Sequence, residues 1–89
     1  MIRIICYTKK NCEPCKIMMR IVSNAVVDAN TDISYSIRHN DSFTVEELTK
    51  LKVRMYPTTV IEKDGKEIAR LEGTFPQAYV ADVINKIEK

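Results

Sequence analysis

The sequence predicts a single α/β domain whose elements follow the order β-α-β-α-β-β-α, with a four-stranded mixed sheet flanked by helices. Short runs rich in β-branched residues alternate with segments whose apolar residues recur at three- and four-residue spacing. An Asp-Gly pair joins the last two strand-like runs, which is the strongest short-range signal for a hairpin. At 89 residues the chain has the length of one domain, residues 1–89.

The first half of the chain predicts a parallel β-α-β unit. Residues 2–7 form a β-branched run that ends in a polar loop. Apolar residues at helical spacing then predict a helix over residues 13–29, with Pro14 in the first turn, where proline is tolerated. Residues 33–37 alternate in polarity and predict a strand with one buried face. Such a strand–helix–strand connection is right-handed and its two strands are parallel.

The second helix of the prediction begins at a capping box. Thr44 can cap the helix, and Glu47 three residues later completes the pattern. Phe43 and Leu48 stand where a hydrophobic staple would pack. The apolar stripe of this helix is expected at Val45, Leu48 and Leu51. The helix should end before the Met-Tyr-Pro segment at residues 55–57.

A hairpin and a last helix complete the chain. Residues 58–62 and 67–71 are the hairpin strands, and the turn between them requires positive φ at Asp64 and Gly65. Residues 73–77 open the last helix. Its buried stripe is expected at Val80, Val83, Ile84 and Ile87. The sheet should therefore be mixed, with helices on both faces.

Composition argues against several classes of function. The apolar fraction of 45% and charged fraction of 29% are ordinary for a globular domain. The net charge is only +2 and opposite charges alternate, so we expect no nucleic-acid partner. No apolar run reaches the length of about 18 residues that a membrane helix needs. Residues 1–6 lack the pattern of a secretory signal, so a cytoplasmic protein is expected, and a monomer because no second apolar surface is evident.

Cys12 and Cys15 carry the predicted chemistry. A thiolate is the nucleophile in disulfide exchange, and a helix N-terminus lowers the pKa of a cysteine placed there. Cys12 would sit at the helix cap, and Cys15 one turn on could reach it to form a disulfide. Pro14 stiffens the turn between them. The charged residues around the pair are Lys9, Lys10, Lys16, Arg20 and Glu13. The lysines would favour the Cys12 thiolate, but exposed charges are screened by salt, so the helix end should matter more.

Two other readings of the pair remain open. A Cys-x-x-Cys pair can be half of a zinc site, which needs four ligands. The chain offers only Cys6 and His39 besides, and we expect Cys6 to be a small core residue and His39 to lie on the surface. A metal module would retain zinc or copper(I) with little turnover. A redox-inert adaptor would keep the fold for binding and tolerate loss of Cys12.

Two segments resemble the thioredoxin superfamily. Residues 12–16, Cys-Glu-Pro-Cys-Lys, are similar to thioredoxin's Cys-Gly-Pro-Cys-Lys. Residues 53–58, with the following strand and the Lys-Asp-Gly-Lys turn, resemble its second signature and hairpin, and Gly73 falls where thioredoxins have a substrate-groove glycine. The resemblance implies a thioredoxin-like fold in which Pro57 is a cis proline packed against the cysteines. A trans proline that starts a strand is the alternative.

The resemblance also implies the activity. It implies a thiol–disulfide oxidoreductase that reduces protein disulfides, with Cys12 as nucleophile and Cys15 as resolving cysteine. The implied partners are disulfide-containing proteins and either a thioredoxin-reductase-type flavoprotein or glutathione. We expect no cofactor other than the redox-active Cys12–Cys15 disulfide and no metal. The substrate contacts implied are Tyr56, Thr58, Gly73, Pro14 and Lys16. By location, the groove could also include Met55, Thr8 and Phe75.

The sequence departs from thioredoxins at several positions. It begins at the first strand of the redox core, which resembles glutaredoxins and the small glutaredoxin-like thioredoxins of archaea and phages. Asn11 replaces a tryptophan, and Cys6 replaces a buried aspartate thought to help deprotonate the second cysteine. Glutaredoxin's Thr-Val-Pro is Met-Tyr-Pro here, and its Gly-Gly-Asp is absent around Gly73. A glutathione-dependent glutaredoxin is therefore the alternative to a thioredoxin-like reductase.

Overall fold

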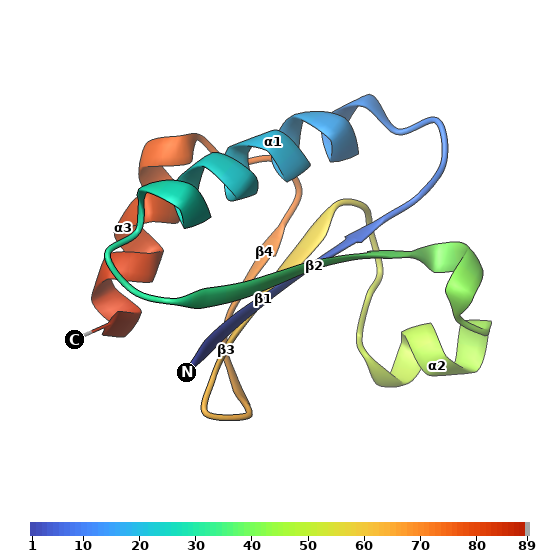
Figure 1. Ribbon diagram of the computed structural model, residues 1–89. Coiled ribbons are helices and arrows are strands. Elements are labelled where there is room, and N and C mark those ends of the chain that lie inside the picture. The colour runs from blue at the N-terminus through green and yellow to red at the C-terminus, as the bar shows by residue number, and fades with distance from the viewer. Residues whose placement is uncertain (89) are drawn as a thin grey trace.

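The computed structural model describes residues 1–88, and its elements follow the predicted order (Figure 1). They are β1 (Ile2–Thr8), α1 (Glu13–Asp28), β2 (Ile33–His39), a short 3-10 helix η1 (Asn40–Ser42), α2 (Val45–Lys50), β3 (Thr58–Lys63), β4 (Lys66–Glu72) and α3 (Gln77–Glu88). The predicted fold class is confirmed. None of the helices within residues 1–88 has the length and apolar character needed to cross a bilayer.

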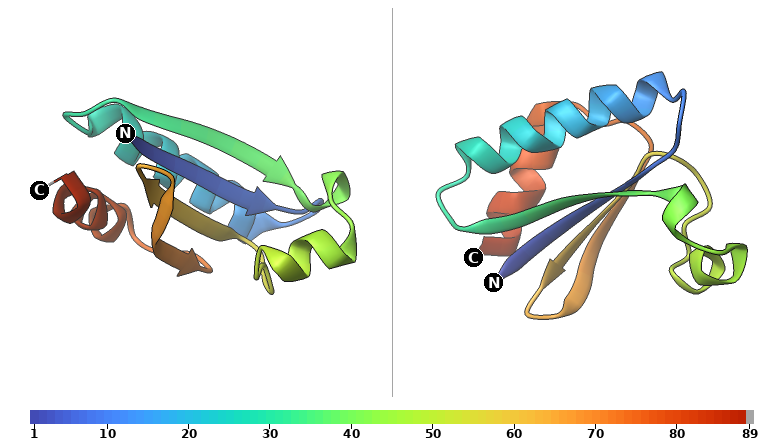
Figure 2. Two further views of the ribbon diagram at one scale, coloured as in Figure 1. Left: turned by 90° about the horizontal axis from the view of Figure 1, so that it is seen from below. Right: turned by 45° about the vertical axis from the view of Figure 1, so that its right-hand side comes forward.

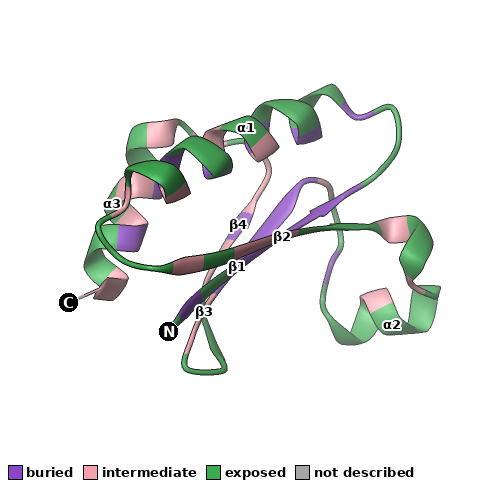
Figure 3. Ribbon diagram, viewed as in Figure 1, coloured by how far each residue is buried: buried purple, intermediate pink, exposed green. Residues whose placement is uncertain are grey.

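The four strands form one mixed sheet with the order β2-β1-β3-β4. β1 and β2 are parallel, with Thr8 opposite His39, whereas β3 is antiparallel to both β1 and β4. The central strands β1 and β3 are the most buried (Figure 3). β2 was expected to have one buried face, and this is confirmed in part: Ile33 and Tyr35 are partly buried against the main core, whereas Ile37 is 45% exposed.

The main core lies between the sheet and the pair α1 and α3. Both helices lie on one side of the sheet and α2 lies on the other (Figure 2). The buried residues of this core are Ile2, Ile4, Met18, Val22, Ala25, Ile61, Leu71, Val80 and Ile84. Val83 and Ile87 are partly buried against it, which confirms the stripe predicted for α3. The Tyr35 hydroxyl donates to the Met19 carbonyl at 3.3 Å and ties β2 to α1.

A smaller core lies under α2. Its buried residues are Ile5, Tyr7, Val53 and Val60. Phe43 and Leu48 pack against this cluster, and the rings of Tyr7 and Phe43 have centroids 6.0 Å apart. Val45, predicted to belong to the apolar stripe of α2, is 80% exposed. Leu48 thus packs against the cluster, whereas Val45, at the first position of the six-residue helix, faces solvent.

Local signals in the sequence account for the ends of several elements. The Thr44 hydroxyl accepts the Glu47 N–H at 3.1 Å, and the Glu47 carboxylate accepts the Thr44 N–H at 2.8 Å, so the predicted capping box is present. Asp64 and Gly65 have φ values of 53° and 83°, as the predicted hairpin turn requires. The N-terminal ammonium contacts Asp64 Oδ1 at 2.7 Å and holds the hairpin against the start of β1.

Two valines of α1 test which side of this helix supports the fold. Val22 is fully buried, so Val22→Ala should lower the free energy of unfolding by about 2–3 kcal/mol through lost burial and a residual cavity. Val27 is 79% exposed, so Val27→Ala should change it by less than about 0.5 kcal/mol. Urea denaturation followed by circular dichroism measures both. Equal losses in the two variants would contradict the packing described here.

Candidate active site at the start of helix α1

The cysteine pair lies where β1 passes through a short loop into α1. Asn11 adopts a positive φ of 55°, a conformation that asparagine tolerates better than most residues, and turns the chain toward the helix. Cys12 is the N-cap in an extended conformation, and its carbonyl accepts the N–H of Lys16 at 3.2 Å. Pro14 stands in the first turn, where its missing N–H costs no helical hydrogen bond. The local sequence therefore fixes Cys12 at the helix terminus.

Cys12 and Cys15 form a disulfide, with their Cα atoms 5.2 Å apart. The Cys15 backbone N–H also donates to Cys12 Sγ at 3.2 Å. Cys12 is 6% exposed and Cys15 only 1% exposed, so Cys12 is the more accessible residue of the pair. When the pair is reduced, this N–H and the positive end of the helix dipole would stabilise the Cys12 thiolate. The geometry is that of a nucleophile and a resolving thiol.

Two of the lysines expected to support the thiolate are paired with carboxylates. Lys16 Nζ lies 3.2 Å from Glu13 Oε1, and Lys10 Nζ lies 3.6 Å from Asp41 Oδ2. All four side chains are exposed, and such surface pairs contribute little. These lysines are therefore weak contributors to the field at Cys12. The helix terminus is the main electrostatic feature at the sulfur.

Pro57 lies at the same end of the central strands as the cysteine loop. Tyr7 pairs with Thr58 in the antiparallel register of β1 and β3, so Pro57 lies beside the end of β1 that leads to Cys12. Pro57 is buried and the Tyr56–Pro57 peptide bond is cis, as the resemblance implies. The roles of these residues in substrate binding stay predictions.

Gly73 is joined to the Pro57 segment. Its N–H donates to the Pro57 carbonyl at 2.8 Å. Gly73 has a φ of 99°, which favours glycine, and a Cβ built there would lie 3.6 Å from Cε of Met55. The half-exposed Met55 side chain therefore lies beside Gly73. Gly73 and Met55 are therefore neighbours beside the segment that carries the buried Pro57.

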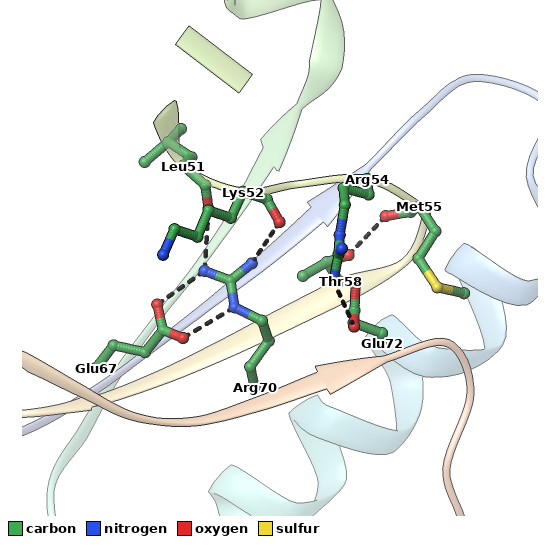
Figure 4. A network of polar contacts seen from close by, with 8 residues as sticks. All are labelled: Leu51, Lys52, Arg54, Met55, Thr58, Glu67, Arg70 and Glu72. Atoms are coloured by element: carbon green, nitrogen blue, oxygen red, sulfur yellow. Dashed lines mark hydrogen bonds and ion pairs between the residues drawn. The ribbon is translucent and has the colours of Figure 1, made fainter. Parts of the chain in front are cut away.

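The other predicted contact residues differ in accessibility. Pro14 and Lys16 are exposed and Tyr56 is half-buried, and its burial raises the pKa of the Tyr56 phenol. Thr58 is fully buried, and its hydroxyl donates to the Met55 carbonyl at 2.6 Å (Figure 4). Neither Thr58 nor Thr8, both expected at the substrate groove, has an exposed side chain that could contact a substrate.

The Thr8 side chain is also fully buried, and its hydroxyl hydrogen-bonds with His39 Nδ1 at 3.2 Å. Both threonines therefore support the loops of the site from within. His39 is exposed at the end of β2, in agreement with its predicted surface position. Its ring nitrogen is thus engaged in holding the end of β1.

Cys6 is a free, fully buried thiol on β1. The Thr59 hydroxyl donates to its sulfur at 3.8 Å, and burial raises the pKa of the Cys6 thiol. Cys6 therefore behaves as the small core residue that the sequence predicts. Within residues 1–88, no three His, Cys, Asp or Glu side chains are grouped so as to hold a metal ion.

Sequence reasoning missed the side chains of β4 that contact the chain before Pro57. Arg70 donates to the backbone carbonyls of Leu51 and Lys52, and Glu72 pairs with Arg54 at 3.7 Å (Figure 4). The only local signal was the alternation of charged residues along this strand. That alternation does not identify partners that lie 18 or 19 residues away in the chain.

The family model for thioredoxin matches residues 2–86 of the chain. The protein belongs to the thioredoxin family. In a thioredoxin domain, a disulfide at the cap of this helix supports thiol–disulfide oxidoreductase activity. The match covers nearly all of the described residues.

Solved structures of other thioredoxins share the fold. The malaria parasite thioredoxin-2, described as a component of the protein secretion machinery, has a TM-score of 0.84 and 16% identity over 97% of this chain and 82% of its own. Chloroplastic thioredoxin z has a TM-score of 0.80 and 21% identity over 99% of this chain and 79% of its own. A further malarial protein has a TM-score of 0.82 and 16% identity over 97% and 96% of the two chains. At these identities the likeness shows the fold alone.

The environments of the three cysteines predict different alkylation rates in the reduced protein. Cys12 should react first with iodoacetamide, with a pH midpoint below the usual thiol pKa of about 8.5, because the helix terminus stabilises its thiolate. Cys6 should stay unmodified until the protein unfolds, because it is buried and its pKa is raised. Mass spectrometry of timed samples measures each site. A Cys12 midpoint at or above about 8.5, or equal rates for Cys6 and Cys12, would contradict the geometry.

Proposed function

We propose that this thioredoxin-family protein reduces protein disulfides by dithiol exchange through Cys12 and Cys15. The observation that carries the proposal is the placement of Cys12 at the cap of α1, where its sulfur accepts the Cys15 N–H at 3.2 Å. A thiolate at a helix N-terminus is favoured at neutral pH, and the thiolate is the reactive form. Cys15, one helical turn on, is already within bonding distance of it.

The first step is attack of the Cys12 thiolate on one sulfur of the substrate disulfide. The substrate S–S bond breaks, a Cys12–substrate mixed disulfide forms, and the other substrate sulfur leaves as a thiolate that takes up a proton. Cys12 is suited to this step because it is the more exposed residue of the pair. The helix terminus that stabilises its negative charge is in place before the substrate binds.

The second step is attack of Cys15 on the Cys12 sulfur of the mixed disulfide. Cys15 loses its proton, the Cys12–Cys15 disulfide forms, and the second substrate sulfur is released and protonated. The substrate has then gained two electrons and two protons. The protein has lost the two electrons and the Cys15 proton, and the second proton comes from the solvent, to which Cys12 released it on ionising. Because Cys15 is almost fully buried, water and other thiols reach it less easily than the neighbouring Cys12 sulfur reaches it.

The segment around Pro57 supplies a surface for a substrate strand. Pro57 has no backbone N–H, and the half-buried Tyr56 precedes it at the end of the sheet. The free backbone groups of Tyr56 can pair with an extended substrate segment, as in strand addition. Met55 and Gly73 lie beside this position and would contact the residues that flank the substrate cysteine.

We propose that the oxidised pair is recharged by a thioredoxin-reductase-type flavoprotein. Residues 72–75, Glu-Gly-Thr-Phe, lack the Gly-Gly-Asp with which glutaredoxins hold glutathione. The carboxylate nearest to this turn, Glu72, is paired with Arg54 at 3.7 Å. Both features favour a protein reductase over glutathione. Reduction by glutathione is the alternative, and the activity assay below separates the two.

The three cysteines allow a matched test of the activity. The wild-type protein should accelerate reduction of insulin disulfides by dithiothreitol, measured as turbidity, and Cys12→Ser should reduce the rate to the uncatalysed level. Cys15→Ser should make one attack and accumulate as a mixed disulfide visible by mass spectrometry. Cys6→Ala removes the third thiol, which is outside the mechanism, and should leave turnover unchanged.

The source of electrons is tested in the same assay. With NADPH, a thioredoxin-reductase-type flavoprotein should sustain insulin reduction, whereas NADPH with glutathione and glutathione reductase should not. Turnover with glutathione alone would assign the glutaredoxin alternative. Activity that survives in Cys12→Ser would contradict the proposed chemistry itself.

A further inference from the structure

Arg70 of β4 connects this strand to the end of α2. Its guanidinium Nη1 donates to the Lys52 carbonyl at 2.9 Å, and Nη2 donates to the Leu51 carbonyl at 3.0 Å. Nε and Nη2 each donate to an oxygen of Glu67 at 2.8 Å. Figure 4 shows the planar group held between the Glu67 carboxylate and the two carbonyls. All its nitrogens are therefore used within the protein.

The two carbonyls lack partners in the helix. Leu51 is the C-cap of α2, and Lys52 has a positive φ of 60°, which turns the chain away from the helix axis. The last carbonyls of a helix have no N–H donor of their own and carry the negative end of its dipole. A helix of six residues has little intrinsic stability, so tertiary contacts must hold its end. Arg70 supplies such a contact.

Arg70 and Glu67 each stabilise the charged form of the other. Hydrogen bonding from Arg70 lowers the pKa of the Glu67 carboxyl, and Glu67 raises the pKa of the Arg70 guanidinium. The Arg70 side chain is only 20% exposed, so its geometry is restrained by packing as well as by charge. The forked guanidinium reaches two adjacent carbonyls at once, which a lysine ammonium does not reproduce.

The end of β4 and the residue after it contact the same connecting segment at two later points. Glu72 pairs with Arg54 at 3.7 Å, and Gly73 donates to the Pro57 carbonyl at 2.8 Å. Arg70 and Glu72 point to the face of the sheet that α2 covers, because they alternate along β4 and lie opposite Val60 and Thr58. Residues 51–57 are thus attached to β4 near their start, middle and end.

We propose that Arg70 is a positioning residue for substrate binding. By holding residues 51 and 52, it would set where residues 55–57 lie relative to Cys12. The inference rests on the proposed function, in which the backbone at Tyr56 pairs with a protein substrate. Arg70 acts through the backbone, on the face of the sheet opposite α1. Its loss should therefore weaken docking of a protein substrate and leave the reactivity of Cys12 unchanged.

The test compares Arg70→Gln with Arg3→Gln. Arg3 lies on the same face of the sheet, is paired with Glu62 at 3.4 Å, and loses the same charge when replaced. For insulin, Arg70→Gln should raise KM about tenfold, the size of one lost hydrogen bond to a charged donor, with kcat unchanged. For bis(2-hydroxyethyl) disulfide, which is too small to pair with the Tyr56 backbone, both kinetic constants should stay at the wild-type value. Arg3→Gln should leave both substrates unaffected.

A second measurement does not depend on activity. Amide hydrogen exchange in residues 52–56 should be faster in Arg70→Gln than in wild type and unchanged in Arg3→Gln. Unchanged exchange, or an unchanged KM for insulin in a folded Arg70→Gln protein, would overturn the positioning role. An equal loss of activity with both substrates would also overturn it, because the effect would then lie in the cysteines or the whole fold.

Arg70→Lys keeps the positive charge and covers the case in which Arg70→Gln does not fold. It retains at most one of the two carbonyl contacts, so its KM for insulin should lie between those of wild type and Arg70→Gln. A wild-type KM in Arg70→Lys would overturn the requirement for the forked guanidinium. Failure of the proposed function would look different, because the wild-type protein itself would then not reduce insulin.

Discussion

Helix α1 packs on the sheet through a single buried stripe, and the position of its first residue follows from that packing. Met18, Val22 and Ala25 are held against β1 and β3, so the start of the helix is fixed at the edge where β1 ends. The N–H groups at this start are oriented dipoles that cannot turn away from the cap position. Cys12 occupies that position, and its sulfur meets an environment suited to a thiolate. The placement of Cys12 thus depends on the packing of core residues further along the helix.

The second part of the site arrives through strand pairing. β1 leads to the cysteines and β3 begins after Pro57, and their antiparallel register sets Tyr7 opposite Thr58. This register brings Pro57 to the same edge of the sheet as the cysteine loop. Arg70 of β4 and Gly73, which follows β4, then restrain residues 51–57 through hydrogen bonds to Lys52 and Pro57. Residues 51–57, which lie outside the helices and strands, are in this way attached to the sheet.

The sequence predicted those features that depend on neighbouring residues. The order of the elements, the capping box at Thr44, and the hairpin at Asp64 each rest on contacts within a few positions. The position of the cysteines at the start of a helix was predictable for the same reason. A strand and a polar loop precede the helix, and Pro14 stands in its first turn. Periodicity also identified the buried stripes of α1 and α3, since those helices are long enough to show it.

The features that sequence reasoning missed depend on residues far apart in the chain. Val45 is exposed because it does not reach the smaller core on the sheet, against which Leu48 of the same helix packs. Thr8 is buried at the end of a central strand, and its hydroxyl hydrogen-bonds with His39 of the neighbouring strand. Arg70 binds backbone carbonyls, which every residue has, so no residue type in the sequence identified its partners.

The central claim is that Cys12 and Cys15 form a reversible two-electron redox couple and Cys6 does not take part. The most direct measurement is a count of reactive thiols, by alkylation and mass spectrometry, across buffers of graded glutathione ratio. Cys12 and Cys15 should lose reactivity together at one midpoint of the glutathione ratio. Cys6 should react only after unfolding, and then to the same extent at every ratio. If the pair stayed reduced throughout, or if the two cysteines were oxidised independently, the account would be contradicted.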